Sequence, residues 1–431
     1  MWALVDCDNF FCSCERVFRP DLRRTPLVVL SNNDGCVVAR SAETKAMGVK
    51  MGLPYFQLLQ QYPGSGIVAF SSNYRLYGDM SARVVSILRS EAPEIIQYSI
   101  DEAFMNLSGM EAAVDLKAWG EQLAAKVRRW TGIPVSIGIA PTKTLAKVAS
   151  RFAKRYPGYR KCCLIGSDEQ RVAALRLFEV GDVWGIGRRI ARSLESRGVK
   201  TAYDFTLKPR LWVRRLYHVT GERTWEELRG RSAIDLREMD VTKKSIMTSR
   251  SFPGMITSLD DLQSHVANYA ARCAAKLRRQ GSVCQTVSVF IQSNHFRPDL
   301  PQYDMGGMFT FTTATATTIE IVDTALRILT GIFRPGISYK RAGVMVSEIT
   351  SDGAIQPDLF EYDPDRALKF RSVSEAIDAI NARLGADTVI LGAQQYRETD
   401  ASGKHIKFTS AIKRSLKSPD YTASPDDFKI I

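Results

Sequence analysis

The order of strand-like and helix-like segments constrains the fold of this 431-residue chain more than any other feature. A short apolar run at 3–6 predicts a buried strand, residues 95–107 alternate around a tight acidic bend, and residues 112–130 carry apolar side chains at helical spacing. A cleanly alternating segment at 133–139 and a helix-like segment at 144–153 follow. This order of strand, hairpin, helix, strand and helix predicts an α+β domain with helices packed on one sheet.

A second α+β pattern lies later in the chain, beyond a basic helical stretch. Residues 245–350 contain three strand-like runs and two helix-like segments. Between Arg171 and Arg231, 14 lysines and arginines stand against 7 acidic residues, which gives this stretch a net charge of +7. The whole chain carries +13, so more than half of the excess lies here. The length and the alternation together predict three or four domains.

The positive charge predicts a polyanionic partner. The sequence has 59 Lys and Arg against 46 Asp and Glu, with a pI near 9.3. No apolar run reaches the ~18–20 residues that a membrane-spanning helix needs, and the first residues do not form a secretory signal peptide. None of the eight cysteines has the spacing of a zinc site, so we expect reduced thiols. We therefore expect a cytoplasmic, nucleoid-associated protein with no membrane contact.

Two acidic clusters lie where strands are expected to end. Asp6-Cys7-Asp8 closes the first strand, and Ser99-Ile100-Asp101-Glu102 forms the bend of the hairpin. Carboxylates on neighbouring strands of one sheet can converge, and their hard oxygen atoms suit Mg²⁺. Two such ions ~4 Å apart can activate a 3′-hydroxyl and stabilise departing pyrophosphate. Either cluster alone could consist of ordinary turn residues, whereas the two together predict a two-metal site.

Several long motifs resemble those of the Y-family of DNA polymerases. The general motifs are ALVDCDNFFCSCERVF at 3–18, YSIDEAF at 98–104 and GIAPTKTLAKVAS at 138–150. Other segments resemble the UmuC branch of the family, the catalytic subunits of bacterial DNA polymerase V. These segments are LSNNDGCVVAR at 30–40, FSSNYRLYGDMS at 70–81, DVWGIGRRI at 182–190 and SPDYT at 418–422. The resemblance covers essentially the whole chain.

The resemblance implies a multidomain α+β fold shaped like a right hand. The expected domains are a ferredoxin-like palm at 1–24 and 68–168, small fingers at 25–67, a helix-hairpin-helix thumb at 169–232, a linker at 233–244, an α+β little finger at 245–350, and a tail at 351–431 with clamp-binding and partner-binding regions. Order is expected to weaken in the tail. The implied activity is error-prone translesion synthesis in an SOS-type response to DNA damage. Deoxynucleotides would be added to a primer 3′-hydroxyl by two-Mg²⁺ phosphoryl transfer.

The resemblance also implies roles for individual residues around the acidic clusters. Asp6, Asp101 and Glu102 would be the catalytic, metal-binding carboxylates, and the backbone carbonyl of Cys7 would be a further ligand. The residues expected to bind the incoming nucleotide are Phe10, Phe11, Arg40, Lys45 and Lys154. Among these, Phe11 matches the steric-gate aromatic, where the UmuC pattern has Tyr, and Lys45 stands where many relatives have Arg, which unlike Lys grips phosphate bidentately.

Further residues match elements that hold DNA or a partner. Gly185 and Gly187 match a helix-hairpin-helix turn that is followed by Arg188 and Arg189, and helix-start amides there can bind phosphate. The other residues singled out are Lys340 and Arg341, which suit phosphate contact or an ordinary surface pair, and Gln356, Leu359 and Phe360, which resemble a peptide that docks in the bacterial sliding clamp. The implied partners are primer–template DNA, a deoxynucleoside triphosphate, the clamp, a UmuD′-like dimer and RecA with ATP.

Two other functions remain open from the sequence. The chain could be a catalytically silent DNA-binding scaffold in a repair assembly, although the conjunction of Asp6, Asp101 and Glu102 argues against this. It could also be another two-metal enzyme on a similar palm, a nuclease or a nucleotide cyclase. The basic thumb and the clamp-like peptide favour a primer–template over either alternative. Release of pyrophosphate rather than shortened DNA would separate a polymerase from a nuclease.

Overall fold

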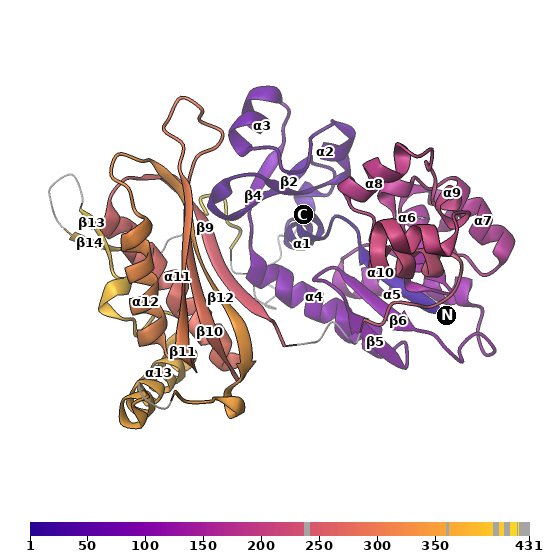
Figure 1. The fold of residues 1–431 in the computed structure, drawn as a ribbon. Coiled ribbons are helices and arrows are strands. Elements are labelled where there is room, and N and C mark those ends of the chain that lie inside the picture. The colour runs from indigo at the N-terminus through magenta and orange to yellow at the C-terminus, as the bar shows by residue number, and fades with distance from the viewer. Residues whose placement is uncertain (237–241, 359–361, 400–404, 409–413, 420, 422–431) are drawn as a thin grey trace. The chain divides into compact units, whose positions relative to one another are not determined.

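A computed structural model describes residues 1–236, 242–358, 362–399, 405–408, 414–419 and 421 (Figure 1). The chain divides into two compact units. The first unit comprises Met1–Asp240 together with Arg414–Ile431, and the second comprises Val241–Lys413. The second unit is therefore inserted, in sequence, between two parts of the first. No helix among the described residues is long and apolar enough to cross a membrane.

A five-stranded sheet forms the centre of the first unit. In spatial order its strands are β5 (Glu94–Gln97), β6 (Glu102–Asn106), β1 (Trp2–Cys7), β7 (Val135–Ala140) and β8 (Cys162–Leu164). The central strand β1 is antiparallel to both β6 and β7. Ala3 and Val5 of β1 contribute to one core and Leu4 to the other, because successive side chains of a strand point to opposite faces. Both faces of the sheet are therefore buried.

Different helices cover the two faces of this sheet. One face packs against α1 (Phe10–Phe18), α4 (Tyr74–Arg89) and α5 (Leu116–Thr131). The other face packs against α6 (Lys143–Arg155). Helix α6 lies so close to β7 that a side chain on Gly138 would meet the Ser150 amide nitrogen at 2.0 Å. Glycine at 138 therefore allows α6 to lie directly on the strand beside β1.

A smaller sheet and a helical group complete the main part of the first unit. The three-stranded sheet has the order β3 (Val37–Arg40), β2 (Leu27–Leu30), β4 (Val68–Ser71), with α2 (Ala42–Ala46) and α3 (Tyr55–Gln61) beside it. The helical group consists of α7 (Asp168–Arg176), α8 (Arg188–Glu195), α9 (Ala202–Thr206) and α10 (Arg210–Leu228). Capping boxes begin α7 at Ser167 and α9 at Thr201, which satisfies amides at the start of each helix.

The second unit is a four-stranded antiparallel sheet with helices on one face. Its strands are, in spatial order, β11 (Asp304–Thr315), β10 (Ser282–Ser293), β12 (Tyr339–Ser351) and β9 (Ser245–Ile256). Helices α11 (Leu259–Arg279) and α12 (Thr318–Ile332) bury their apolar faces against this sheet. The two units confirm the expected α+β architecture.

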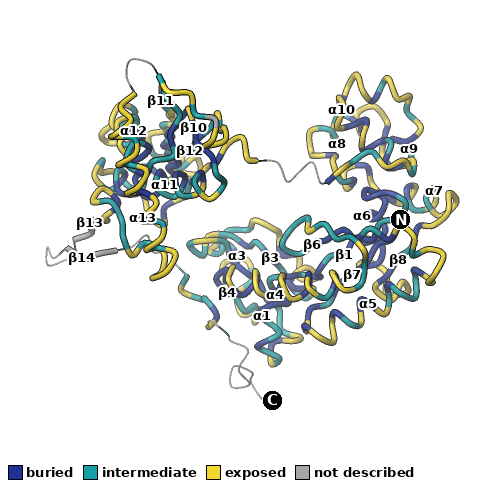
Figure 2. The backbone as a smooth tube through the Cα atoms, turned by 90° about the horizontal axis from the view of Figure 1, so that it is seen from below, coloured by how far each residue is buried: buried dark blue, intermediate teal, exposed yellow. Residues whose placement is uncertain are grey.

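The tail contains more regular structure than its composition predicts. Helix α13 (Pro364–Leu384) extends over 21 residues, and β13 (Tyr396–Thr399) pairs with β14 (His405–Phe408). Most of α13 is exposed or half-buried, and Ser374 is its buried residue (Figure 2). The sequence analysis did not anticipate α13, because the helix lacks the broad apolar face by which a core-packed helix is recognised.

Candidate active site

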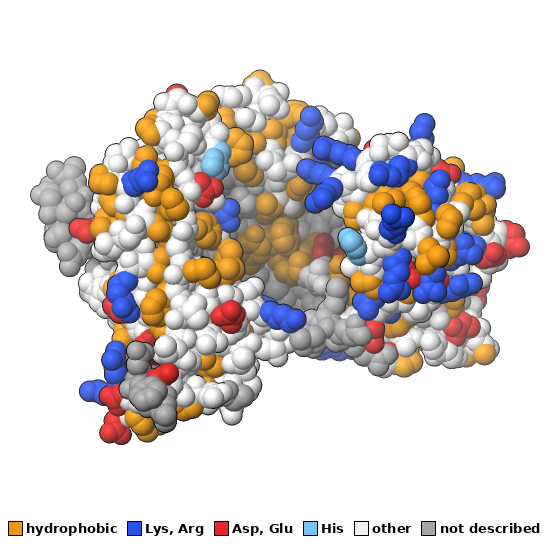
Figure 3. Space-filling view, viewed as in Figure 1, with side chains coloured by type: hydrophobic (Ala, Val, Ile, Leu, Met, Phe, Trp, Pro, Cys, Tyr) orange, Lys and Arg blue, Asp and Glu red, His pale blue; other side chains and the backbone are white. Residues whose placement is uncertain are grey.

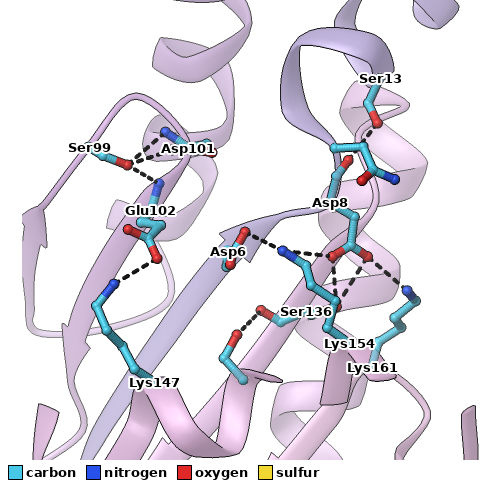
Figure 4. A network of polar contacts seen from close by, with 12 residues as sticks. Asp6, Asp8, Ser13, Ser99, Asp101, Glu102, Ser136, Lys147, Lys154 and Lys161 are labelled. Carbon is cyan, nitrogen blue, oxygen red and sulfur yellow. Dashed lines mark hydrogen bonds and ion pairs between the residues drawn. The ribbon is translucent and has the colours of Figure 1, made fainter. Parts of the chain in front are cut away.

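Strand pairing brings the predicted carboxylates together. In the antiparallel register of β1 and β6, Asp6 lies directly opposite Glu102, and Asp101 immediately precedes β6 (Figure 4). The Cys7 amide donates a hydrogen bond of 2.9 Å to the carbonyl of Asp101. The three carboxylates named from the sequence therefore come from two neighbouring strands at the same end of the sheet.

The bend before β6 is organised by one serine hydroxyl. Ser99 Oγ accepts hydrogen bonds from the amides of Asp101 (3.2 Å) and Glu102 (3.0 Å) and donates to Asp101 Oδ1 at 2.6 Å (Figure 4). A hydroxyl bonded to the following backbone amides stabilises a tight turn. Ser99 therefore fixes both the turn and the rotamer of Asp101.

Lysine ammonium groups lie against two of these carboxylates. Lys154 Nζ is 2.8 Å from Asp6 Oδ1, and Lys147 Nζ is 2.7 Å from Glu102 Oε1. Burial raises the pKa of Asp6 to about 6, against the opposing effect of Lys154, and the nearby charges of Glu102 and Asp101 raise it further. The site therefore concentrates buried negative charge that needs cations beside it.

Lys147 was not identified from the sequence. Its ammonium lies over the rings of Tyr98 (4.6 Å) and Trp184 (5.4 Å) as well as beside Glu102. The indole nitrogen of Trp184 donates to the Tyr98 hydroxyl at 3.1 Å. An aromatic pair under an ammonium restricts its position. The available signal was the seven-residue spacing from Lys147 to Lys154, which places both lysines on one side of α6.

The oxygen donors suit a hard divalent cation. Within the described part of the chain, no three acidic, imidazole or thiol groups already stand close enough together to hold a metal ion. The Cys7 thiol lies in the core, where burial raises its pKa well above the usual range. The Cys7 side chain therefore belongs to the core, and metal binding by its carbonyl stays a prediction.

Asp8 supports the site without joining the three carboxylates. It is buried, and its carboxylate accepts hydrogen bonds from Ser136 Oγ (2.9 Å) and Lys161 Nζ (2.8 Å). Lys154 lies between Asp6 and Asp8, at 2.8 and 3.5 Å. Asp8 therefore holds Lys154 at the edge of the carboxylate cluster.

Three of the residues predicted to bind the nucleotide, Phe10, Phe11 and Lys45, lie around the start of α1. The ring of Phe11 stacks on Tyr77, with centroids 4.3 Å apart, and meets the edge of Tyr74 at 5.9 Å, while Phe10 is buried. Lys45 donates a hydrogen bond to Asn9 Oδ1. Burial lowers the pKa of Lys45, and the charges of Lys154 and Arg40 lower it further. The charge of Lys154, a second lysine predicted to bind the nucleotide, is therefore felt at Lys45.

Family models and relatives match almost the whole sequence. A model described as the impB/mucB/samB family matches residues 5–151, and the C-terminal domain of that family matches 243–359. A domain of unknown function matches 371–430. Protein UmuC of Salmonella typhimurium is 40% identical over 429 residues, which cover 99% of each chain. Protein MucB of Escherichia coli is 37% identical over 98% of this chain and 97% of its own.

The chain is a UmuC-type member of the impB/mucB/samB family. DNA polymerase IV of Brucella melitensis is a more distant relative, 28% identical over 90% of this chain and 84% of its own. Among solved structures, a Y-family DNA polymerase chimera of Dbh and Dpo4 aligns with a TM-score of 0.64 at 19% identity. That alignment covers 81% of this chain and 99% of the chimera, which confirms the Y-family fold.

In this UmuC-type chain, the predicted helix-hairpin-helix turn lies in the helical group of the first unit. Gly185 has φ +90°, and a side chain there would meet Thr224 Oγ1 at 2.6 Å. Gly187 precedes α8, and Arg188 and Arg189 are exposed at the start of that helix. Figure 3 shows lysine and arginine side chains gathered over this helical group. The turn therefore has the backbone that glycine permits and an exposed basic helix start.

The remaining predicted residues have different surroundings. Lys340 Nζ donates to the backbone carbonyl of Phe252 at 2.7 Å, and Arg341 donates to Ser249 Oγ at 3.0 Å. Both side chains therefore contribute to the packing of their own unit. Arg40 donates to the carbonyl of Val49. Of the clamp-like peptide, Gln356 is exposed, whereas Leu359 and Phe360 lie outside the described residues.

Proposed function

We propose that this UmuC-type chain is an error-prone translesion DNA polymerase. It transfers a deoxynucleotide to a primer 3′-hydroxyl opposite damaged template, in an SOS-type response. The observation that carries this proposal is the pairing of Asp6 with Glu102 beside Asp101, in a member of a polymerase family. The basic lysines next to these carboxylates suit a triphosphate better than an uncharged substrate.

Each residue of the site has a distinct task in this reaction. Asp6, Asp101, Glu102 and the Cys7 carbonyl would hold two Mg²⁺ ions. Bound there, the ions supply charge neutralisation at the hydroxyl and at the leaving pyrophosphate. Lys154 leaves Asp6 when the nucleotide arrives and, with Lys45, binds triphosphate oxygens. Lys147 keeps the Glu102 carboxylate facing Asp6, because its ammonium is fixed over an aromatic pair.

Phe11 selects deoxyribonucleotides through its volume. A flat ring under the sugar leaves no room for a ribose 2′-hydroxyl, and a phenylalanine ring fills the same space as the tyrosine of the UmuC pattern. Only the hydrogen bond of the phenol is lost. Replacement of Phe11 by Ala should therefore increase ribonucleotide incorporation, and an unchanged incorporation ratio would refute this role.

Duplex DNA and protein partners are assigned to other surfaces. Arg188, Arg189 and the amides at the start of α8 would contact phosphates without reading sequence. Lys340 and Arg341 are weaker candidates, because both side chains have partners within their own unit. The clamp would bind Gln356, Leu359 and Phe360, and a UmuD′-like dimer and RecA with ATP would assist synthesis.

Primer extension on a template with an abasic site tests the proposal. Wild type and Asp101→Ala are assayed with Mg²⁺ and dNTPs, each alone and with UmuD′ and RecA–ATP. Asp79→Ala is a matched control, because Asp79 is an exposed acid paired with Arg83 on α4. We expect extension by wild type and the control, and none by Asp101→Ala. DNA binding without extension under every condition would favour a silent scaffold, and shortened DNA would favour a nuclease.

A further inference from the structure

A short C-terminal segment lies against the first unit, although it follows the second unit in sequence. The Ser71 amide, at the end of β4, donates to the carbonyl of Leu416 at 3.0 Å, and Ser71 Oγ accepts from the Leu416 amide at 2.9 Å. The Ser415 amide donates to Asp34 Oδ2 at 3.0 Å. The segment is therefore held through its backbone to the edge of the three-stranded sheet. It lies within the domain of unknown function.

Two side chains of the segment insert into the first unit. Ser418 is 4% exposed, accepts a hydrogen bond from Asn73 Nδ2 at 3.0 Å and donates to Glu15 Oε1 at 3.3 Å. The ring of Tyr421 lies parallel to that of Phe18, with an interplanar angle of 5° and centroids 4.3 Å apart. A buried hydroxyl and a stacked ring are features of a packed interior rather than of a surface contact.

A continuous set of contacts leads from Ser418 to Phe11. Glu15 Oε1 also accepts a hydrogen bond of 2.7 Å from the Tyr77 hydroxyl, and both of these residues are 0% exposed. The ring of Tyr77 also stacks on the ring of Phe11, with an interplanar angle of 14°. Ser418, Glu15 and Tyr77 are thus linked by hydrogen bonds, and Tyr77 touches Phe11.

The Glu15 carboxyl depends on these two hydroxyl donors. Its second oxygen, Oε2, is buried and has no hydrogen-bond partner among the described residues. Burial raises the pKa of Glu15 to about 7, while the hydrogen bonds from Tyr77 and Ser418 lower it. A buried polar group that loses a partner is costly. Loss of the Ser418 hydroxyl therefore favours a rearrangement of Glu15 and of the Tyr77 hydroxyl bonded to it.

We propose that the segment formed by residues 415–419 and Tyr421 positions the nucleotide pocket. Ser418 and Glu15 hold Tyr77, and Tyr77 holds the Phe11 ring where it excludes ribonucleotides. The inference rests on the proposed role of Phe11 as steric gate. Ser418, Glu15 and Tyr77 are positioning residues, because they act on the nucleotide through Phe11. This part of the domain of unknown function thereby has a role in sugar selection.

Single-nucleotide incorporation by the full-length protein tests this inference. The ratio of ribonucleotide to deoxyribonucleotide use is measured for Ser418→Ala, Tyr77→Phe and Phe11→Ala. Tyr77→Phe keeps the ring and removes the hydroxyl. We expect Ser418→Ala and Tyr77→Phe each to raise the ratio about five-fold, the effect of one net hydrogen bond. Phe11→Ala should raise the ratio further, and Ser418→Thr, which keeps a hydroxyl, should leave the ratio as in wild type.

The matched control is Ser415→Ala. Ser415 is exposed, and its hydrogen bond to Asp34 comes from the backbone amide, which the substitution keeps. Its ratio should be that of wild type. Hydrogen exchange of the peptide containing residues 72–77 gives a readout that needs no catalysis. Exchange there should be faster in Ser418→Ala than in Ser415→Ala.

The outcomes separate this inference from the proposed function. An increased ratio in Phe11→Ala, with unchanged ratios in Ser418→Ala and Tyr77→Phe, would overturn the positioning role and leave the polymerase assignment standing. A parallel decrease in the incorporation of ribonucleotides and deoxyribonucleotides, without a change in their ratio, would mean that the segment only stabilises the fold. An unchanged ratio in Phe11→Ala would overturn the gate and this inference together. Absence of any extension by wild type would count against the proposed function. The hydrogen-exchange comparison would still test this inference, because equal exchange in Ser418→Ala and Ser415→Ala would refute the positioning role of Ser418.

Discussion

Two buried carboxyl groups in the first unit have opposite surroundings. Asp6 accepts a hydrogen bond from the ammonium of Lys154, whereas Glu15 accepts hydrogen bonds from the hydroxyls of Tyr77 and Ser418. Burial raises both pKa values, to about 6 for Asp6 and about 7 for Glu15. The partner of Asp6 carries a positive charge, whereas the hydroxyl partners of Glu15 carry none, so burial raises the pKa of Glu15 without an opposing cation. This difference in partners goes with the different roles proposed for the two acids.

The largest expected difference between the two acids is in catalysis. Asp6→Asn should lower the incorporation rate at least ~10³-fold, because a metal-binding charge is lost from the centre of the reaction. Glu15→Gln should retain correct deoxynucleotide incorporation within about three-fold, because the amide oxygen can still accept a hydrogen bond. Single-turnover rates of both variants measure this. Equal losses would mean that burial, not partner type, determines the role.

The second difference concerns how the free energy of unfolding depends on pH. The pKa of Glu15 rises from 4.5 in its ordinary environment to about 7 in the fold, so folding favours the protonated form. Its stabilising contribution is fully present below pH 4.5 and is lost as the pH rises to about 7. Unfolding of wild type should therefore become easier relative to Glu15→Gln by roughly 3 kcal/mol between pH 4.5 and 8.

Urea unfolding at a series of pH values, followed by a probe in the first unit, measures this difference. Asp6 is present in both proteins, so its own titration cancels in the comparison. A stability difference that does not vary with pH would show that folding leaves the pKa of Glu15 unchanged.

The smallest of these effects compares two lysines beside Asp8. Lys154 bridges Asp6 and Asp8, whereas Lys161 contacts Asp8 at 2.8 Å. Lys154→Ala should raise the KM for the nucleotide about 10- to 100-fold, the effect of a charged hydrogen bond to phosphate. Lys161→Ala is the matched control and should change it less than about three-fold. Similar values for the two variants would refute the role of Lys154 in triphosphate binding.

The carboxylate cluster could be predicted because its geometry follows from local rules. Asp6 closes a short apolar strand and Asp101 with Glu102 forms a bend, so antiparallel pairing of these strands suffices to bring them together. The same holds for Ser99, whose contacts are with residues two and three positions away. Motif matches supplied the rest, because Phe11 and Lys45 carry no local signal that distinguishes them from core and surface residues.

The contacts of Ser418 could not be predicted, because 403 residues separate it from Glu15 and 345 from Asn73. No periodicity reports on a pairing of that separation. The sequence stretch SPDYT was informative only as a mark of resemblance. Likewise, Lys340, a candidate phosphate ligand, donates a hydrogen bond to the carbonyl of Phe252, which is 88 residues away. Position within a strand does not reveal such a partner.

The return of the chain to the first unit at Arg414 also affects how the second unit is attached. Val241–Lys413 is an insertion, joined to its host through both of its ends rather than through a single linker. A module fastened at two points has less translational freedom than one fastened at one, and its effective concentration near its host is correspondingly higher. The contacts of Ser71, Asn73 and Glu15 with Leu416 and Ser418 therefore anchor the second of the two connections to this module.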